Sequence, residues 1–189
     1  MRMKCLFIII DPQNDFTHKD GNYATRHGIS QINDAISKIN LVAAAKHFNT
    51  VIVRADYQPE QFIQGESMAI PGTFGHEIDA RIALQDTTTI VSKPEHSCFS
   101  SADFVDMLKK ERINTLVISG FLAEYCIEQT ALDALASDYR VILVRDAIGT
   151  GDDVQYRRVN LFKTLQEKGC ILLDAADALQ SDLSARDNF

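Results

Sequence analysis

The sequence predicts a three-layer α/β/α protein, doubly wound around a six-stranded parallel sheet. Short apolar segments alternate along the chain with segments in which apolar residues recur every three or four positions. This alternation is typical of βαβ units, which place helices on both faces of a parallel sheet through right-handed crossovers. The first apolar segment, residues 4–10, is a continuous run, as in a strand buried on both faces. A length of 189 residues favours a single domain over residues 1–189.

The predicted strands and helices alternate from one end of the chain to the other. We expect strands at residues 4–10, 50–54, 88–91, 115–119, 140–144 and 170–173. We expect helices from residue 29, where Ile32, Ile36 and Ile39 recur at helical spacing, around Phe104 and Leu108, and at residues 124–136, 154–165 and 175–179. Residues 55–75 are the one long irregular region, and a loop of that length in a compact domain is often functional.

Charge and hydropathy argue against two classes of partner. The chain has 26 acidic and 19 basic residues and a net charge of -7, whereas nucleic-acid binders carry a basic face. The apolar run at residues 5–10 is far shorter than the ~20 residues of a membrane span, and Asp11 follows it without a signal-peptide cleavage site. We therefore expect no nucleic-acid partner, no membrane partner and a cytoplasmic location. The sequence also lacks a dinucleotide fingerprint after the first strand, a Walker A motif and a GxSxG elbow.

The four cysteines divide into two pairs. No CxxC motif is present, which argues against a zinc ribbon and a thioredoxin-type site, and a disulfide framework is not expected in a cytoplasmic chain of this size. Cys5 and Cys170 lie in apolar strand segments, so they are predicted to be buried thiols. Cys98 and Cys126 remain as candidates for chemistry.

Polar residues follow three predicted strands at the point where each strand ends. Asp11 follows the first strand, Lys93 follows the third, and Cys126 begins a helix after the fourth. Sites in doubly wound sheets form at the carboxyl ends of the strands, so these side chains can converge. A lysine and a helix N-terminus favour a thiolate, and an aspartate can move its proton. The residues alone leave alternatives open: a loop cap for Asp11, a surface lysine for Lys93 and a buried thiol for Cys126.

Three long phrases carry a family resemblance. FIIIDPQNDF at 7–16, SKPEHSCF at 92–99 and ISGFLAEYCIEQTALDA at 118–134 resemble the isochorismatase-like cysteine hydrolases, which include nicotinamidases, N-carbamoylsarcosine amidases and isochorismatases. The resemblance implies a six-stranded parallel sheet of order 3-2-1-4-5-6. It also implies a catalytic triad of Asp11, Lys93 and Cys126, the residues that the strand ends had singled out.

The resemblance further implies the surroundings of Cys126. A cis peptide bond is expected between Phe121 and Leu122, and the backbone amides of Leu122 and Cys126 are expected to form an oxyanion hole. Phe16 and Tyr125 are predicted to be pocket walls for a small or flat acyl group, with core packing as the alternative. Cys98 is predicted to be a packing residue.

The metal ligands of nicotinamidases are only partly present. Those relatives carry an Asp-x-His motif and a second histidine that hold a divalent metal, whereas this sequence reads Asp56-Tyr57-Gln58. Glutamine is a poor ligand for a transition metal beside imidazole. His76 lies near the expected second position, and a lone loop histidine more often faces solvent. We therefore predict neither a catalytic metal nor another cofactor.

The predicted function is hydrolysis of a C–N bond in a small amide through a thioester at Cys126, with Asp11 as general base and Lys93 supporting the thiolate. The alternatives are an isochorismatase-type vinyl-ether hydrolase, a metal-dependent nicotinamidase, and a non-enzymatic flavodoxin-type binding or scaffold module. Besides a small-molecule substrate, the resemblance implies a homodimer or a larger even-numbered homo-oligomer. Its candidate interface comprises apolar residues of the outer helices: Leu132, Leu135, Leu161 and Phe162.

Overall fold

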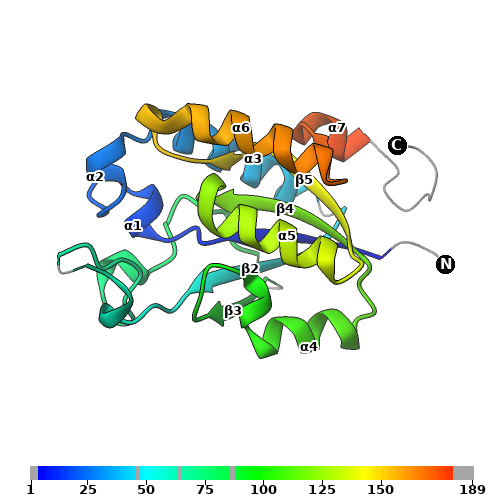
Figure 1. Cartoon of the computed structure of the whole chain (residues 1–189), viewed down its shortest axis with the longest axis horizontal. Helices are drawn as coiled ribbons and strands as arrows, with labels where there is room; N and C mark the ends of the chain where they lie inside the picture. The colour runs from blue at the N-terminus through cyan, green and yellow to red at the C-terminus, as the bar shows by residue number, and fades with distance from the viewer. Residues whose placement is uncertain (1–3, 46, 64, 86–87, 181–189) are drawn as a thin grey trace.

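The computed structural model describes residues 4–45, 47–63, 65–85 and 88–180. Its six strands form one parallel sheet of order β3-β2-β1-β4-β5-β6, which confirms the predicted fold class and strand order (Figure 1). The strands are β1 (Cys5–Ile10), β2 (Asn49–Ala55), β3 (Thr89–Lys93), β4 (Thr115–Phe121), β5 (Arg140–Gly149) and β6 (Ile171–Leu173).

The longer helices cover the two faces of this sheet. Helices α3 (Ser30–Ala44) and α7 (Ala175–Gln180) pack on one face, and α4 (Ala102–Lys110), α5 (Glu128–Ala136) and α6 (Gln155–Glu167) pack on the other. The short helices are α1 (Asn14–Thr17), α2 (Ala24–His27), the 3-10 turns Pro59–Gln61, Phe74–His76, Cys98–Ser100 and Asp152–Val154, and the π-helical turn Ala123–Ile127. Within the described residues, no helix is long and apolar enough to cross a bilayer.

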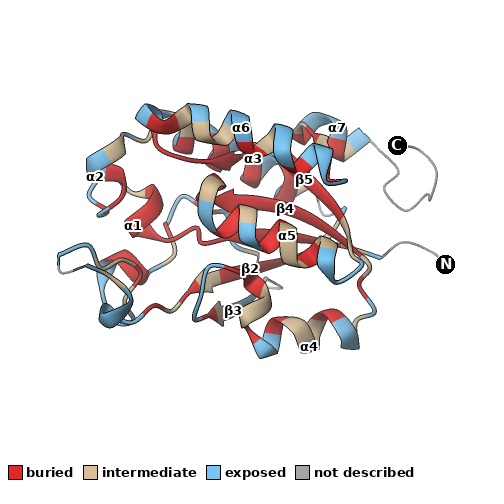
Figure 2. Cartoon of the chain, viewed as in Figure 1, coloured by how far each residue is buried: buried red, intermediate tan, exposed pale blue. Residues whose placement is uncertain are grey.

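Strand β1 lies at the centre of the core. Successive side chains of a strand point to opposite faces, so Phe7 and Ile9 pack toward α3, and Leu6, Ile8 and Ile10 pack toward the opposite helices. This explains the continuous apolar run. The central strands are buried along most of their length, whereas the helices are exposed on their outer sides (Figure 2).

Two neighbouring strands, β1 and β4, define the edge where a site can form. The chain leaves β1 toward β2 on one side and returns to β4 on the other, which makes this the point where the strand order reverses. The two strands approach closely at Gly120, whose φ is +114 and where a Cβ atom would collide with the backbone of Ile10. Glycine is therefore required there, directly before the turn that carries Cys126.

Several local predictions need correction. β5 extends to Gly149 rather than ending at residue 144, because its pairing with β4 shifts register between Ile118 and Gly120 and then resumes. The helix predicted from residue 124 begins as a π-helical turn and becomes α-helical only at Glu128. Cys5, the first residue of β1, is only partly buried and packs at the margin of the core, whereas Cys170 is buried as expected.

Candidate active site

Asp11, Lys93 and Cys126, predicted from three separate strand ends, lie together at the carboxyl edge of the sheet. Lys93 Nζ is 2.9 Å from Asp11 Oδ2 and 3.4 Å from Cys126 Sγ. Asp11 and Lys93 have no exposed surface, and Cys126 is 4% exposed. We call these three residues the floor of the site.

Because Asp11 and Lys93 are both buried, each charged side chain needs the other as its partner. Among the described residues, neither carboxylate oxygen of Asp11 has a hydrogen-bond partner of good geometry, so its compensation is the ion pair with Lys93. The Lys93 ammonium also donates to the carbonyl oxygen of Glu95 at 2.9 Å and to Tyr57 Oη at 3.3 Å. An unpaired charge would be costly at such a depth, so the pair is held as a unit.

Burial also shifts the pKa values of the three floor residues. Burial raises the pKa of Asp11, against the opposing charge of Lys93. Burial, followed by the charge of Asp11, raises the pKa of the Cys126 thiol despite the lysine. For Lys93, burial lowers the pKa, but the charges of Asp11 and Cys126 outweigh it and raise the pKa above its ordinary value.

Two opposing influences act on the thiol. The charge of Lys93 lowers the pKa of Cys126, which is the direction expected from the sequence, but desolvation and the neighbouring carboxylate outweigh it, so the thiol holds its proton more tightly than an ordinary cysteine. Asp11 is then the adjacent group that can accept this proton, since burial has raised its basicity as well.

The turn after β4 holds the sulfur in place. The Phe121–Leu122 peptide bond is cis. The carbonyl oxygen of Leu122 accepts hydrogen bonds from the amides of Tyr125 and Ile127 at 3.2 and 3.3 Å. The amides of Leu122 and Cys126, which were predicted to form an oxyanion hole, lie in and beside this turn, and that role stays a prediction.

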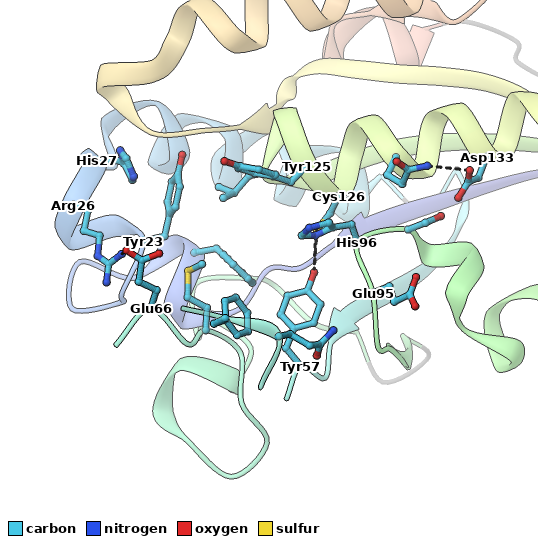
Figure 3. Close-up of a pocket in the computed structure, with 17 residues that line it drawn as sticks. Tyr23, Arg26, His27, Tyr57, Glu66, Glu95, His96, Tyr125, Cys126 and Asp133 are labelled. Carbon is cyan, nitrogen blue, oxygen red and sulfur yellow. Dashed lines mark hydrogen bonds and ion pairs between the residues drawn. The ribbon is translucent and has the colours of Figure 1, made fainter. Parts of the chain in front are cut away.

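A cavity of about 710 Å³ opens above the floor. Phe16 and Tyr125 both line it, where the sequence analysis had weighed a pocket wall against core packing. Phe16 is also buried in the core at 5% exposure, whereas Tyr125 is 44% exposed. Figure 3 shows Cys126 near the middle of the lining residues, with Arg26 and Glu66 on one side of it and Glu95 and Asp133 on the other. Arg26 and Glu66 form an ion pair with 3.5 Å between the charged atoms.

Two lining residues escaped the sequence analysis. Tyr57 Oη lies 3.4 Å from Cys126 Sγ, and His96 Nδ1 lies 3.7 Å from the same sulfur. Tyr57 Oη and His96 Nδ1 are 3.2 Å apart, and the two side chains face one another in Figure 3. A usable signal was present, because Tyr57 follows the end of β2 by two residues and His96 follows the end of β3 by three.

Comparisons with known proteins show the family to which the chain belongs. A family profile described as the isochorismatase domain matches residues 5–177. The chain belongs to the isochorismatase family.

Curated members of the isochorismatase family with similar sequences include several hydrolases. An N-carbamoylsarcosine amidase of an Arthrobacter species is 36% identical over 73 residues, which are 39% of this chain and 28% of that protein. A maleamate amidohydrolase of Pseudomonas putida is 26% identical over 58% of this chain and 56% of its own length. This chain thus spans less than two thirds of either relative. A nicotinamidase of Acinetobacter baylyi is 25% identical, over 78% of this chain and 84% of that protein.

Solved structures of the isochorismatase family share the fold. An isochorismatase-like hydrolase from Alkaliphilus metalliredigens superposes with a TM-score of 0.78 at 24% identity, over 94% of this chain and 98% of that one. An N-carbamoylsarcosine amidase from Thermoplasma acidophilum gives a TM-score of 0.76 at 24% identity, over 92% and 97% of the two chains. At such identity the likeness concerns the fold alone.

The residues that would hold the nicotinamidase metal do not form a suitable site here. His76 is buried rather than facing solvent, and its Nε2 lies 2.5 Å from Asp56 Oδ1. Burial would raise the pKa of Asp56, but hydrogen bonds from His76 and Ser92 hold it below its ordinary value. The side chain at the third position is Gln58, and the described residues contain no group of three or more histidine, cysteine or acidic side chains that could bind a metal.

The remaining candidate thiol, Cys98, packs in the core. It is fully buried, its amide donates to Thr130 Oγ1 at 3.0 Å, and burial raises the pKa of its thiol to about 12. It is not part of the cavity lining that the structure describes. Its location agrees with the predicted packing role.

Proposed function

We propose that this protein is a cysteine hydrolase that cleaves a C–N bond of a small amide through a thioester at Cys126. The observation that carries the proposal is the floor, where Lys93 Nζ contacts both Asp11 Oδ2 and Cys126 Sγ beneath an open cavity. Amidases among the curated relatives support the bond type. A vinyl-ether hydrolase would make no thioester at this sulfur, and the family membership argues against a flavodoxin-type module.

The floor supplies the groups that thioester formation needs. Asp11 takes the proton from Cys126 Sγ as the sulfur bonds to the carbonyl carbon of the amide. The Lys93 ammonium stabilises the negative charge on the sulfur, and the amides of Leu122 and Cys126 receive the carbonyl oxygen as it becomes an oxyanion. When the C–N bond breaks, Asp11 returns its proton to the leaving nitrogen. Water then hydrolyses the thioester.

A panel of small amides tests the proposal. We would incubate the protein with nicotinamide, maleamate and N-carbamoylsarcosine, the substrates named by the relatives, and with other primary amides and carbamoyl amines, and would measure released ammonia. At least one amide should be turned over by the native protein and not by Cys126→Ala. Turnover that survives Cys126→Ala would contradict the proposal.

The same assay tests the metal-dependent alternative. Because Asp56 and His76 bind each other and Gln58 stands at the third position, activity is expected to be unchanged after dialysis against EDTA. A loss of activity that zinc, iron or manganese restores, together with stoichiometric metal that is absent from His76→Ala, would favour the metal-dependent reaction instead.

A further inference from the structure

The side chain of Tyr57 is fixed beside the Cys126 sulfur. Its backbone amide donates to the carbonyl oxygen of Ala69 at 3.3 Å, and its ring packs edge-on against Phe62 with 5.6 Å between centroids. The residue is 4% exposed, and its hydroxyl oxygen lies 3.4 Å from Cys126 Sγ. Figure 3 shows the ring of Tyr57 pointing toward His96 and Cys126. The hydroxyl group is therefore already in place before the sulfur reacts.

We propose that the Tyr57 hydroxyl is a catalytic hydrogen-bond donor to Cys126 Sγ, which stabilises the thiolate together with the Lys93 ammonium as the thioester forms. This inference rests on the proposed function and adds one residue to it. Two donors reach the sulfur, because Lys93 Nζ and Tyr57 Oη each lie 3.4 Å from it. One donor is charged and the other is neutral, and 3.3 Å separates them. The sulfur thus faces a pair of donors rather than a single cation.

The hydrogen-bonding capacity of the Tyr57 hydroxyl favours donation to the sulfur. The group has one hydrogen to donate and two lone pairs that can accept. Lys93 can only donate, so it occupies a lone pair of the Tyr57 oxygen. Two acceptors then compete for the hydrogen: Cys126 Sγ at 3.4 Å and His96 Nδ1 at 3.2 Å. A negative sulfur is the stronger acceptor, since hydrogen bonds to an ionised group are about twice as strong as those between neutral groups.

The proposed step needs no group beyond these. The S–H bond of Cys126 breaks, its proton goes to a carboxylate oxygen of Asp11, and the electron pair stays on the sulfur as it bonds to the amide carbonyl carbon. The O–H bond of Tyr57 remains intact throughout, so this residue stabilises charge and transfers no proton. Because the sulfur is negative only between loss of its proton and formation of the new bond, the hydrogen bond is strongest at that point.

The titratable groups around the sulfur come from the ends of three strands: Asp11 after β1, Tyr57 after β2, Lys93 at the end of β3, and His96 and Cys98 after it. Burial, followed by the charge of Asp11, raises the pKa of Cys126, whereas the charge of Lys93 lowers it. The hydrogen bond from Tyr57 also lowers the pKa of Cys126. Tyr57 therefore offsets part of the cost of a buried thiolate without adding a charge.

The two neighbouring groups that could interfere with this donor are themselves uncharged. Burial, followed by the charges of Cys126 and Asp11, raises the pKa of Tyr57, so its hydroxyl keeps its hydrogen. Burial, followed by the charge of Lys93, lowers the pKa of His96, while the charges of Asp11 and Glu95 oppose this shift. The imidazole is therefore neutral near pH 7 and competes only weakly with a thiolate for the hydrogen of Tyr57.

Alkylation of Cys126 measures this donor directly and needs no substrate. We would follow labelling by iodoacetamide across a range of pH, with peptide mapping to identify the labelled cysteine. Tyr57→Phe keeps the ring and removes only the hydroxyl, so the thiolate fraction should fall by about ten- to hundredfold. The more basic sulfur is also a better nucleophile, which offsets part of this loss, so labelling near neutral pH should be about three- to tenfold slower.

A matched control removes a hydroxyl elsewhere. Tyr139 lies outside the described cavity lining, where its ring packs against Phe99, so Tyr139→Phe should label at the native rate. In Tyr57→Phe the ammonium of Lys93 keeps its ion pair with Asp11, so the floor remains and circular dichroism should be unchanged.

A second substitution should change the labelling rate in the opposite direction. 3-Fluorotyrosine at position 57 keeps the ring and makes its hydroxyl a stronger donor, so Cys126 should label faster than in the native protein. A purely structural role of the ring would not produce changes of opposite sign. On the best amide of the panel, Tyr57→Phe should lower kcat while KM changes little, because phenylalanine retains the ring surface that lines the cavity.

The outcomes separate this donor from the broader function. If Tyr57→Phe labels at the native rate at every pH, or if both changes at position 57 shift the rate in the same direction, the donor is wrong and the proposed hydrolysis is unaffected. If the labelling rates follow the expected order but the native protein turns over no amide, the donor stands and the proposed hydrolysis fails. A lower kcat in Tyr57→Phe with native labelling would also overturn the donor, since the hydroxyl would then act on the substrate rather than on the sulfur.

Discussion

The floor and the wall of this cavity differ in their exposure to solvent and in the charges they carry. The floor, formed by Asp11, Lys93 and Cys126, is nearly free of solvent and carries two opposite charges. The wall above it, which we define as the cavity-lining residues outside the floor, presents next to the sulfur the neutral groups of Tyr57 and His96. Electrostatic interactions are strong in the floor because little water is present to weaken them, whereas groups of the solvent-accessible wall can exchange protons with water.

This difference teaches how one sulfur can serve two half-reactions. Forming the thioester requires an activated thiol, and the dry, charged floor provides a base and a cation for it. Hydrolysing the thioester requires access for water, and the cavity that the wall encloses provides that access. Substitutions in the floor should therefore lower the rate of the chemical steps, whereas substitutions in the wall away from the sulfur should mainly weaken substrate binding.

The largest expected effect concerns the nucleophile itself. Cys126→Ala should abolish the acyl-enzyme and turnover, and Cys126→Ser should leave little activity, because a serine hydroxyl is a much weaker nucleophile here. Asp11→Asn and Lys93→Ala should each lower the turnover rate by orders of magnitude. Steady-state assays on the best amide of the panel, with circular dichroism as a fold control, would measure this. Native-like turnover by Lys93→Ala would show that the floor is wrongly assigned.

The next largest effect concerns the stability of the floor. Lys93→Met leaves a buried carboxylate without its partner, so the free energy of unfolding should fall by about 3–5 kcal/mol. The pKa of Asp11 then rises further, and a carboxyl with a raised folded pKa stabilises the protein below its ordinary pKa and loses this contribution as pH rises. Urea unfolding should therefore show a larger loss at about pH 8 than at about pH 5.

A double variant provides the matched control for that measurement. Asp11→Asn combined with Lys93→Met removes both charges, so most of the lost stability should return while activity stays absent. If the double variant were as unstable as Lys93→Met alone, the loss would come from packing of the lysine stem rather than from the unpaired charge.

A smaller effect tests how the floor holds the thiol proton. The negative charge of Asp11 raises the pKa of Cys126, so Asp11→Asn should lower it and increase the thiolate fraction. Labelling of Cys126 by iodoacetamide near neutral pH should become about tenfold faster, since a fall of one pKa unit has that effect on a mostly protonated thiol. Peptide mapping would separate this label from Cys98, which lies in the core. Slower labelling in Asp11→Asn would contradict the assigned charges.

A wall residue away from the sulfur should have a milder effect. Tyr125→Ala removes a ring that lines the cavity and is 44% exposed, so substrate affinity should weaken while stability changes little. We expect KM to rise about tenfold, on the order of 1.4 kcal/mol, with a smaller change in kcat. An unchanged KM for the best amide would remove Tyr125 from the substrate pocket.

The smallest expected effect concerns assembly. Leu161, one of the residues predicted at an interface, is buried in the core, so the candidate apolar surface of α6 consists instead of Tyr156 and Val159, which are 60% and 64% exposed. We still expect a homodimer or larger even-numbered oligomer, and Val159→Lys should weaken it without changing the floor. Light scattering of the native protein at micromolar concentration would refute this prediction if it returned the monomer mass of 21.1 kDa.

The sequence analysis singled out the floor because its members lie at or just after the ends of predicted strands and match the family phrases. Continuous apolar runs locate strands such as β1, and parallel strands bring their carboxyl ends to one edge. It missed Tyr57 and His96, which lie on connections after β2 and β3, where no periodicity indicates the direction of a side chain. His76 was misjudged for the same reason, because the sequence separates it from Asp56 by twenty positions and only the folded loop joins them.

The sequence by itself determined the layers, the strand order and the three residues of the floor, because these follow from hydrophobic patterning, the handedness of crossovers and the family phrases. The tertiary structure decided how those residues behave. Local sequence cannot reveal that burial and the charge of Asp11 together raise the pKa of the Cys126 thiol despite the opposing charge of Lys93. Nor can it place Tyr57 between the sulfur and His96, since that contact arises only when two loops from neighbouring strands close over the same edge of the sheet.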